Sequence, residues 1–199
     1  MTKPNLIINN TIKENDYFVF FPDSKETGTK KQAGKIVEYK LTGDLSPSEE
    51  ELLSQELPTP QEKILLPLRL YLLRKEEIHS KYTNFGLWIN THDELKLLNN
   101  IEDINAFPVI AVFIEKFADG RIYSQATLLR QKYKYQNDLR AIGEVLKDQI
   151  FYLKRSGFTS YLIKEGKNVE DALLSLNDFS ENYQSRLNEE PLWKRVSRK

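Results

Sequence analysis

The sequence contains no cysteine, and this absence excludes several kinds of chemistry. Without thiols the chain forms no disulfide, no thiolate zinc site, no iron–sulfur cluster and no cysteine nucleophile. Its eight glycines match neither a dinucleotide-binding fingerprint nor a phosphate-binding loop. The two histidines, His79 and His92, do not have the spacing of metal ligands. The sequence therefore identifies no cofactor and no metal site.

The chain also lacks a net charge and a long apolar run. Lysine and arginine number 29, as do aspartate and glutamate, whereas nucleic-acid-binding proteins usually have a basic excess. The longest apolar runs are about six residues, far below the roughly 20 that a membrane helix needs. The first 20 residues show no signal-peptide pattern. We therefore expect a cytoplasmic protein that binds neither nucleic acid nor membrane.

The N-terminal third predicts a hairpin followed by a polar insertion. Apolar residues at 6–8 and 17–21 flank a polar Asn9-Asn10 turn and predict a hairpin or a pair of short strands. Residues 22–62 are rich in glycine, proline and charge, and predict a partly mobile insertion with a strand at 36–41 and a short helix at 48–53. Leucines at helical spacing then predict a helix over 64–78, with Pro67 in its first turn.

From residue 85 onwards, strand and helix patterns alternate. The expected strands are 85–89, 109–114, 139–142 and 160–163, and the expected helices are 92–99, 121–133, 145–155 and 169–177. A capping box at 91–94 opens the first helix, and Asn168 caps the last. Four consecutive strand–helix units predict an α/β fold with a mainly parallel sheet, either open or a partial barrel. The expected organisation is an N-terminal part (1–63), an α/β domain (64–180) and a polar basic tail (181–199).

A charged sequence follows the second of these strands. Lys116, Asp119, Gly120 and Arg121 lie where the strand meets its helix, which is where α/β proteins bind ligands. Asp119 could cap the helix, and Gly120 could supply a positive φ. Arg121 and the first helical amides could instead hold an anion. Both roles are compatible.

Arg140 lies within an apolar strand, where an unpaired guanidinium would be costly. A carboxylate or a bound anion should therefore meet it. Asp119, Glu144 and Asp148 are the candidate carboxylates. If neighbouring strands bring Arg140 close to Arg121, the two arginines and Gly120 form an anion site.

A helix face and a pair of hydroxyls complete the candidate residues. Asp148, Tyr152 and Arg155 share one face of the helix 145–155, which is either a solvated face or an interaction surface. Tyr123 and Ser124 offer hydroxyls at a helix start. No Gly-x-Ser-x-Gly elbow surrounds Ser124, so a serine hydrolase is poorly supported.

The residues from 119 to 158 carry a resemblance to a known family. Asp119-Gly-Arg-x-Tyr-Ser-x-Ala-x-Leu-Leu-Arg130, then Leu139-Arg-Ala-x-Gly143, Val145-Leu-x-Asp-Gln149 and Arg155-x-Gly-Phe158, resemble the bacterial family of domain of unknown function 934. The resemblance covers about residues 64–180. Two departures are visible: Glu144 stands where aspartate is usual, and residues 22–62 are longer and more polar than the equivalent part of the family.

The resemblance implies a role in sulfite reduction, because members of the family are often labelled as oxidoreductases of that process. The sequence shows no redox carrier, which argues against a free-standing redox enzyme. The leading hypothesis is an accessory protein of assimilatory sulfite reduction that binds the reductase or its electron donor, and also a small oxyanion. One alternative is an enzyme acting on a small anion, with Arg121 and Arg140 as binding groups, Asp119 or Glu144 as general base, and Tyr123 or Ser124 as hydrogen-bond donor. The other is a scaffold or regulator without a ligand. The sequence leaves the oligomeric state open.

Overall fold

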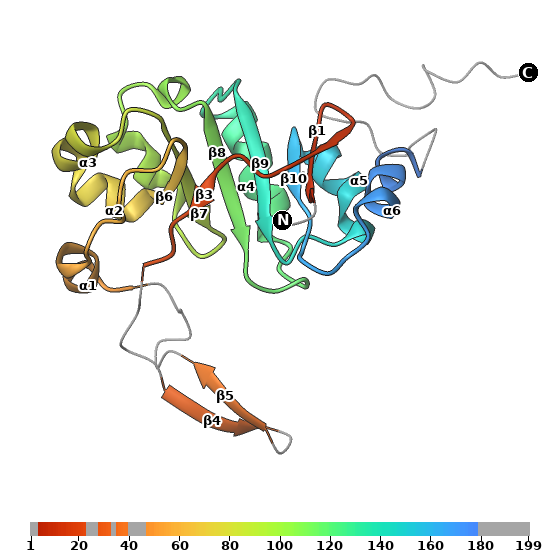
Figure 1. The fold of residues 1–199 in the computed structure, drawn as a ribbon, viewed down its shortest axis with the longest axis horizontal. Helices are drawn as coiled ribbons and strands as arrows, with labels where there is room; N and C mark the ends of the chain where they lie inside the picture. Colours follow the sequence, from red (N-terminus) through yellow and green to blue (C-terminus); the bar gives the residue numbers. More distant parts are fainter. Residues whose placement is uncertain (1–3, 23–27, 33–34, 40–46, 179–199) are drawn as a thin grey trace, which may run out of the picture.

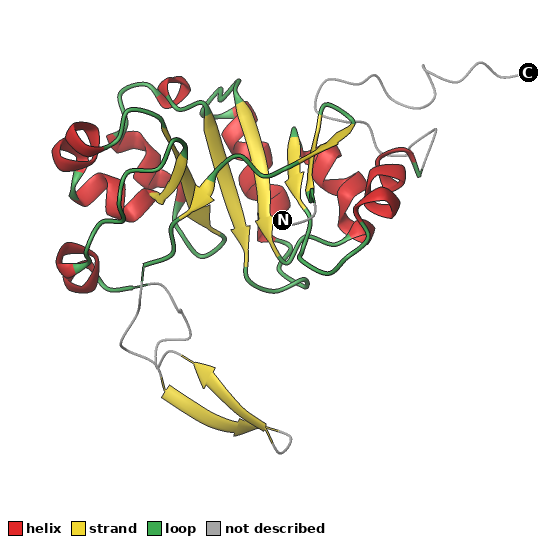
Figure 2. Cartoon of the chain, viewed as in Figure 1, coloured by secondary structure: helices red, strands yellow, loops and turns green. Residues whose placement is uncertain are grey.

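A computed structural model describes residues 4–22, 28–32, 35–39 and 47–178. They form a mixed α/β fold, in which one curled, half-barrel sheet carries helices on one face (Figures 1 and 2). The sheet order is β2-β1-β10-β9-β8-β7-β6-β3. The strands are β1 (Leu6–Ile8), β2 (Thr11–Lys13), β3 (Phe18–Val19), β6 (Ile64–Pro67), β7 (Phe85–Asn90), β8 (Val109–Ile114), β9 (Asp138–Gly143) and β10 (Ser160–Leu162).

The sheet is parallel from β10 to β3, and β1 is antiparallel to both of its neighbours. The continuous apolar sequence of β8 suits this arrangement, because a central parallel strand is covered on both faces. A separate two-stranded sheet pairs β4 (Gly28–Gln32) with β5 (Lys35–Tyr39). The predicted α/β fold is confirmed, but the sheet also has an antiparallel edge.

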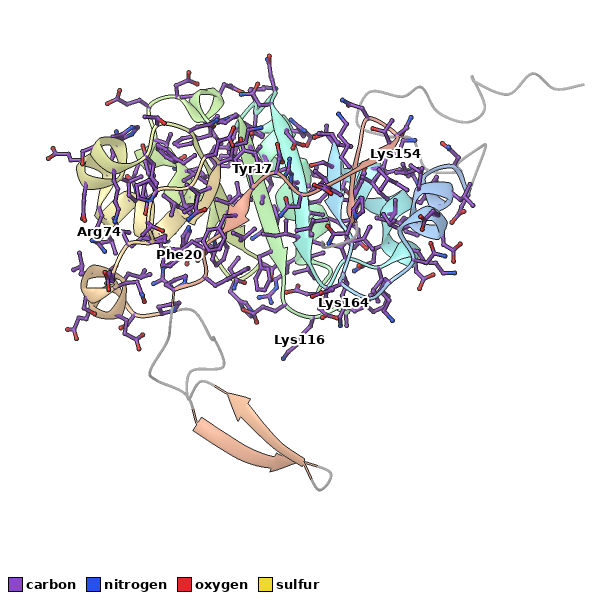
Figure 3. The ribbon with its side chains drawn as sticks, viewed as in Figure 1. Tyr17, Phe20, Arg74, Lys116, Lys154 and Lys164 are labelled. Atoms are coloured by element: carbon purple, nitrogen blue, oxygen red, sulfur yellow. The ribbon has the colours of Figure 1, made fainter. Side chains whose placement is uncertain are left out.

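The helices are α1 (Glu49–Ser54), α2 (Leu68–Leu73), α3 (Lys75–Lys81), α4 (Arg121–Gln131), α5 (Lys147–Ser156) and α6 (Val169–Leu174). Short 3₁₀ segments are η1 (Leu95–Asn100), η2 (Ile104–Ala106) and η3 (Ser175–Asn177). Arg74, between α2 and α3, donates to the carbonyl of Gln55 and so ties α1 to this region (Figure 3). No helix in the described ranges is both long and apolar enough to cross a membrane.

The two faces of the sheet are covered differently. On one face α4 buries Ile122, Ala126 and Leu129 in the main core, as the helical spacing predicts. Residues 14–22, which we call the N-terminal strap, cross the other face from β2 to β3 (Figure 1). A second cluster gathers there: Tyr17, Leu65, Trp88, Val109, Ala111 and Ile142. The indole of Trp88 donates to the carbonyl of Phe20 over 2.8 Å and holds the strap in place.

The predicted N-terminal β-hairpin is present, but its second strand and the helix at 64–78 were placed wrongly. The hairpin partner of β1 is β2, not residues 17–21, because Asn9 and Asn10 adopt positive φ in a tight turn. Residues 18–19 instead pair with β6 at the opposite edge of the sheet. Residues 64–67 are a buried strand, and the helix starts only after Pro67. An apolar run of four residues suits a strand as well as a helix, and here the neighbouring β7 decides.

The capping box predicted at 91–94 is also wrong. The Thr91 hydroxyl donates to Asp119 rather than accepting from a helical amide, and only the 3₁₀ segment η1 follows. Three strand–helix units therefore match the prediction: β8–α4, β9–α5 and β10–α6. The remaining unit, which begins with β7, has no α-helix. The Asn168 cap is confirmed.

The predicted insertion at 22–62 contains β4, β5 and α1 within its described part. The strand predicted at 36–41 is β5, and the helix predicted at 48–53 is α1, which Ser48 and Glu51 cap reciprocally. The mobility of this insertion and the division at residue 63 stay predictions. The predicted tail, 181–199, lies outside the described residues.

Candidate functional site

The carboxyl ends of β7 and β8 bring together polar residues that are far apart in the sequence. The two strands are parallel, with Asn90 opposite Phe113, so the residues that follow each strand meet at one edge. That edge is where ligands bind in open α/β sheets. The sequence-based junction at 116–121 lies at this edge.

Asn90, which is 5% exposed, organises this edge. Its side-chain amide donates to Glu115 Oε1 over 2.7 Å, and its Oδ1 accepts from the His92 amide over 3.1 Å. The backbone amide of Asn90 donates to Asp93 Oδ2 over 2.9 Å. Buried Gln125, from α4, donates to the carbonyls of Asn90, Thr91 and Asp93. These bonds fix the loop after β7 against α4.

Asp119 and Arg121 form a close pair beside this loop. Arg121 donates from Nε and NH2 to the two Asp119 oxygens, over 2.8 and 2.7 Å. Asp119 also accepts from the Thr91 hydroxyl over 2.5 Å and from the Arg121 amide over 3.1 Å. Hydrogen bonding by Arg121, and then by Thr91, holds the pKa of Asp119 well below its usual range, against the effect of partial burial. The Arg121 guanidinium also contacts the His92 ring, 3.1 Å from Nδ1.

A cavity of about 390 Å³, which we call the sheet-end cavity, opens beside these residues. Its apolar wall includes Phe21 from the strap, Trp88 from β7 and Phe113 from β8. The ring of Phe21 lies 5.1 Å from that of Trp88 and 5.0 Å from that of Phe113, between centroids. Its charged lining residues are Arg69, Asp93, Glu115 and Lys116. A neighbouring hollow of about 430 Å³ shares Arg69 and Asp93 and reaches His92.

The two carboxylates and the two cations on the cavity lining differ in their hydrogen-bond partners. Asp93 and Glu115 both accept hydrogen bonds from Asn90, and Glu115 Oε2 lies 3.7 Å from His92 Nε2. Arg69, at the start of α2, is half-buried and forms no ion pair or side-chain hydrogen bond with another described residue. Lys116 likewise has no side-chain partner in the described part of the chain, and it projects from the carboxyl end of the sheet (Figure 3). The cavity therefore has two cations, Arg69 and Lys116, that form no ion pair with a described residue, beside two carboxylates whose hydrogen bonds come from the neutral Asn90.

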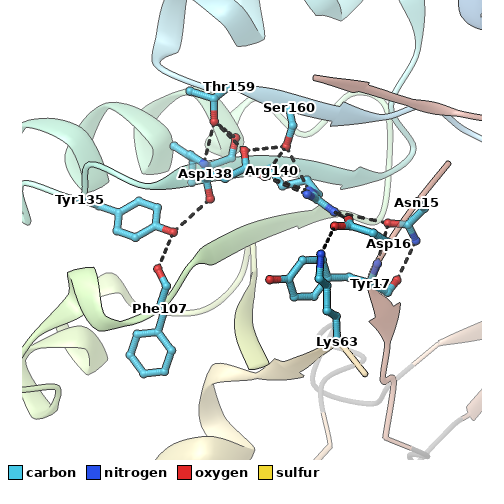
Figure 4. Close-up of polar contacts among 11 residues, drawn as sticks. Asn15, Asp16, Tyr17, Lys63, Phe107, Tyr135, Asp138, Arg140, Thr159 and Ser160 are labelled. Carbon is cyan, nitrogen blue, oxygen red and sulfur yellow. Dashed lines mark hydrogen bonds and ion pairs between the residues drawn. The ribbon is translucent and has the colours of Figure 1, made fainter. Parts of the chain in front are cut away.

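Arg140 lies elsewhere, in a network on the strap face of the sheet (Figure 4). It is 2% exposed and pairs with Asp138 over 2.9 Å and with Asp16 over 3.2 Å. Its Nε donates to Ser160 Oγ over 3.1 Å, and its guanidinium lies 5.2 Å from the Tyr17 ring centroid. The predicted ion pair is present, but Asp119, Glu144 and Asp148 are not its partners. The expected approach of Arg140 to Arg121 is wrong too, because Arg140 pairs in register with Ala111 inside the sheet, whereas Arg121 follows the end of β8.

The structure places the remaining predicted residues apart from the cavity wall. Gly120 has φ −72°, so the predicted positive φ is wrong. Glu144 pairs with Lys164 over 2.6 Å. Tyr123 is half-buried and Ser124 is exposed, both on α4, and burial raises the pKa of Tyr123. On α5, Asp148 and Tyr152 are exposed and Arg155 is half-buried beside the Phe151 ring, so these three keep their predicted helix but remain untested as an interaction surface.

Sequence reasoning missed Arg69, Asn90, Asp93 and Glu115. Two of them were within reach of the strand-end rule, because Asn90 directly follows the expected strand 85–89 and Glu115 directly follows the expected strand 109–114. Asp93 lay within the predicted capping box at 91–94. Arg69 lies on α2, inside the predicted helix 64–78, and no pattern in the sequence singled it out. The strap residue Phe21 reaches the cavity only through the pairing of β3 with β6.

Comparison with known proteins agrees with the motif from residue 119 to 158. The family model described as "Bacterial protein of unknown function (DUF934)" matches residues 86–193, more than half of the chain. No curated protein and no solved structure matches the chain. The family match includes β7 to α6, and so most of the polar network around Asn90 and Asp119. The chain therefore belongs to the DUF934 family of bacterial proteins.

Proposed function

We propose that this protein is an accessory protein of assimilatory sulfite reduction that binds a small anionic molecule in the sheet-end cavity. The single observation behind the binding site is Arg69, a half-buried guanidinium on the cavity wall without an ion-pair partner among the described residues. Removing a cation partly from water is unfavourable unless an anion meets it. The association with sulfite reduction rests on the label carried by the family.

The enzyme alternative required Arg121 and Arg140 to bind one substrate together. Arg140 is committed to Asp138 and Asp16, and Arg121 to Asp119, so these residues do not converge on one substrate. The predicted general bases, Asp119 and Glu144, are paired with Arg121 and Lys164, so either would have to leave an ion pair in order to act. Binding at the sheet-end cavity fits the observed contacts better than catalysis by Asp119, Arg121 and Arg140.

Thermal unfolding with millimolar sulfite, sulfate or phosphate tests the binding site. A ligand at ten times its dissociation constant stabilises the folded state by about 1.4 kcal/mol, which is a measurable rise in a domain of this size. We expect the rise in the wild type, its loss in Arg69→Gln and its persistence in Arg121→Gln. The two variants are matched because each removes one guanidinium from the same end of the sheet.

Each other outcome has a definite meaning. Loss in Arg121→Gln alone would move the anion to the start of α4, where the sequence placed it. An equal rise in all three proteins would indicate a general salt effect and contradict the proposal. No rise in any of them would favour a scaffold without a ligand.

A growth experiment tests the role in sulfite reduction. Cells that lack the gene should grow slowly with sulfate or sulfite as the only sulfur source and normally with sulfide, because sulfide enters after the reductase. Normal growth on all three sources would contradict this part of the proposal without affecting the binding site.

A further inference from the structure

The sheet-end cavity is built for more than an inorganic ion. Its volume of about 390 Å³ falls within the range of roughly 300–1,000 Å³ typical of sites for organic molecules. Sulfite or sulfate would occupy only the region next to a cation. Most of the cavity would then stay in contact with water along an apolar wall, which is unfavourable.

The apolar wall is aromatic and already ordered. The rings of Trp88 and Phe113 lie 5.7 Å apart between centroids, and Phe21 packs at a tilt against both. The Trp88 indole is held by its hydrogen bond to the Phe20 carbonyl. Phe21 lines the cavity and is 48% exposed. Such a wall offers offset or edge contacts to another ring at little ordering cost.

Two cationic side chains lie beside this aromatic wall. Arg69 and Lys116 line the same cavity as the three rings and form no ion pair with a described residue, while the carboxylates of Asp93 and Glu115 accept hydrogen bonds from the neutral Asn90. A guanidinium binds carboxylate, sulfonate and phosphate groups through paired donors. A ligand that satisfies both halves of the cavity carries a flat ring and an anionic group.

We infer that the ligand of the sheet-end cavity is an aromatic or heteroaromatic anion, with its ring against Phe21, Trp88 and Phe113 and its anionic group at Arg69. This inference rests on the proposed function, because it uses the same cavity and the same cation. It adds the ring, which sulfite, sulfate and phosphate lack.

Titration calorimetry with three probes tests the inference. Naphthalene sulfonate has ring and charge, naphthalene sulfonamide has the ring without the charge, and methanesulfonate has the charge without the ring. We expect naphthalene sulfonate to bind roughly tenfold more tightly than either of the others, which is what one aromatic contact or one paired charge contributes.

Two phenylalanine variants separate the ring contact from general effects on the strap. Phe18 and Phe21 are each 48% exposed and both lie in the strap, but only Phe21 lines the cavity. Phe21→Ala should weaken naphthalene sulfonate binding about tenfold and leave methanesulfonate unchanged. Phe18→Ala should change neither. Arg69→Gln should weaken both sulfonates and spare the sulfonamide, and unchanged thermal midpoints would show that all three variants fold.

The remaining outcomes distinguish the two proposals. If methanesulfonate and naphthalene sulfonate bind equally and Arg69→Gln abolishes both, the inference of an aromatic ligand would be wrong. The anion site at Arg69 would remain supported. Equal binding of sulfonamide and sulfonate would show a plain apolar pocket and overturn the anionic ligand. Equal losses in Phe18→Ala and Phe21→Ala would place the effect in the strap as a whole, and no binding of any probe would overturn the inference and the cavity assignment together.

Discussion

Asp138 and Arg140 lie two residues apart on β9, on the same face, with carboxylate and guanidinium 2.9 Å apart. Ser160, on β10, donates to both Asp138 oxygens and accepts from Arg140 (Figure 4). Asp16, from the strap, completes the network. The pair therefore links two strands to the strap.

Replacing Arg140 should destabilise the protein strongly. Arg140→Leu leaves the Asp138 carboxylate without its counter-charge in a largely dry position, so we expect a loss of about 3 kcal/mol in the free energy of unfolding. Lys63→Met is the matched control, because Lys63 pairs with the same Asp16 but is 35% exposed, and it should cost about 1 kcal/mol or less. Urea unfolding measures both. A loss below about 0.5 kcal/mol for Arg140→Leu would contradict the network.

The Asp119 pair should make part of the stability depend on pH. Because Arg121 lowers the pKa of Asp119 in the folded state, its ionised form contributes stability that is fully present above the unfolded pKa of about 3.9. That contribution is lost as the pH falls through the lower, folded pKa. Asp119→Asn should therefore destabilise the protein at pH 7, and the difference from wild type should shrink as the pH falls below about 4. A difference independent of pH, measured by denaturant unfolding, would exclude the ionised pair as its source.

Two glycines of the family motif should respond oppositely to alanine. Gly143 has φ 94°, and an added Cβ would collide with the Ile114 carbonyl oxygen. Gly143→Ala should cost more than about 1 kcal/mol. Gly120 has φ −72° and open space around it, so Gly120→Ala should be neutral or stabilise by up to about 1 kcal/mol. Thermal midpoints compare the two, and an equal loss at Gly120 would restore the special backbone role that the sequence suggested.

The α5 surface is testable through partner binding. Tyr152 is 49% exposed, so Tyr152→Ala should change stability by less than about 0.5 kcal/mol. If Asp148, Tyr152 and Arg155 form the predicted interaction surface, this variant should reduce recovery of sulfite reductase in affinity purification from cells starved of reduced sulfur. Leu174→Ala, at a 73% exposed position on α6, is the control and should leave recovery unchanged. Equal recovery with both variants would remove this surface from the proposal.

The local patterns were sufficient for much of the C-terminal half. The unbroken apolar run of β8, the buried stripe of α4 and the Asn168 cap were all predictable, because each depends on residues close together in the chain. The need of Arg140 for a carboxylate was also predictable from the cost of burying a charge. The pattern from 119 to 158 was enough to indicate the family, which the match over residues 86–193 shows.

Only the tertiary structure decided which distant residues meet. The run at 64–67 becomes a strand because β7 and β3 pair with it on either side, and no property within the run distinguishes a buried strand from a helix. Thr91 has the residue type of a helix cap, but its hydroxyl donates a hydrogen bond to Asp119, 28 positions later. The sheet-end cavity combines Phe21, Arg69, Trp88 and Phe113 from four separate segments. Side-chain contacts across a sheet depend on strand order and register, and these emerge only when the whole chain packs.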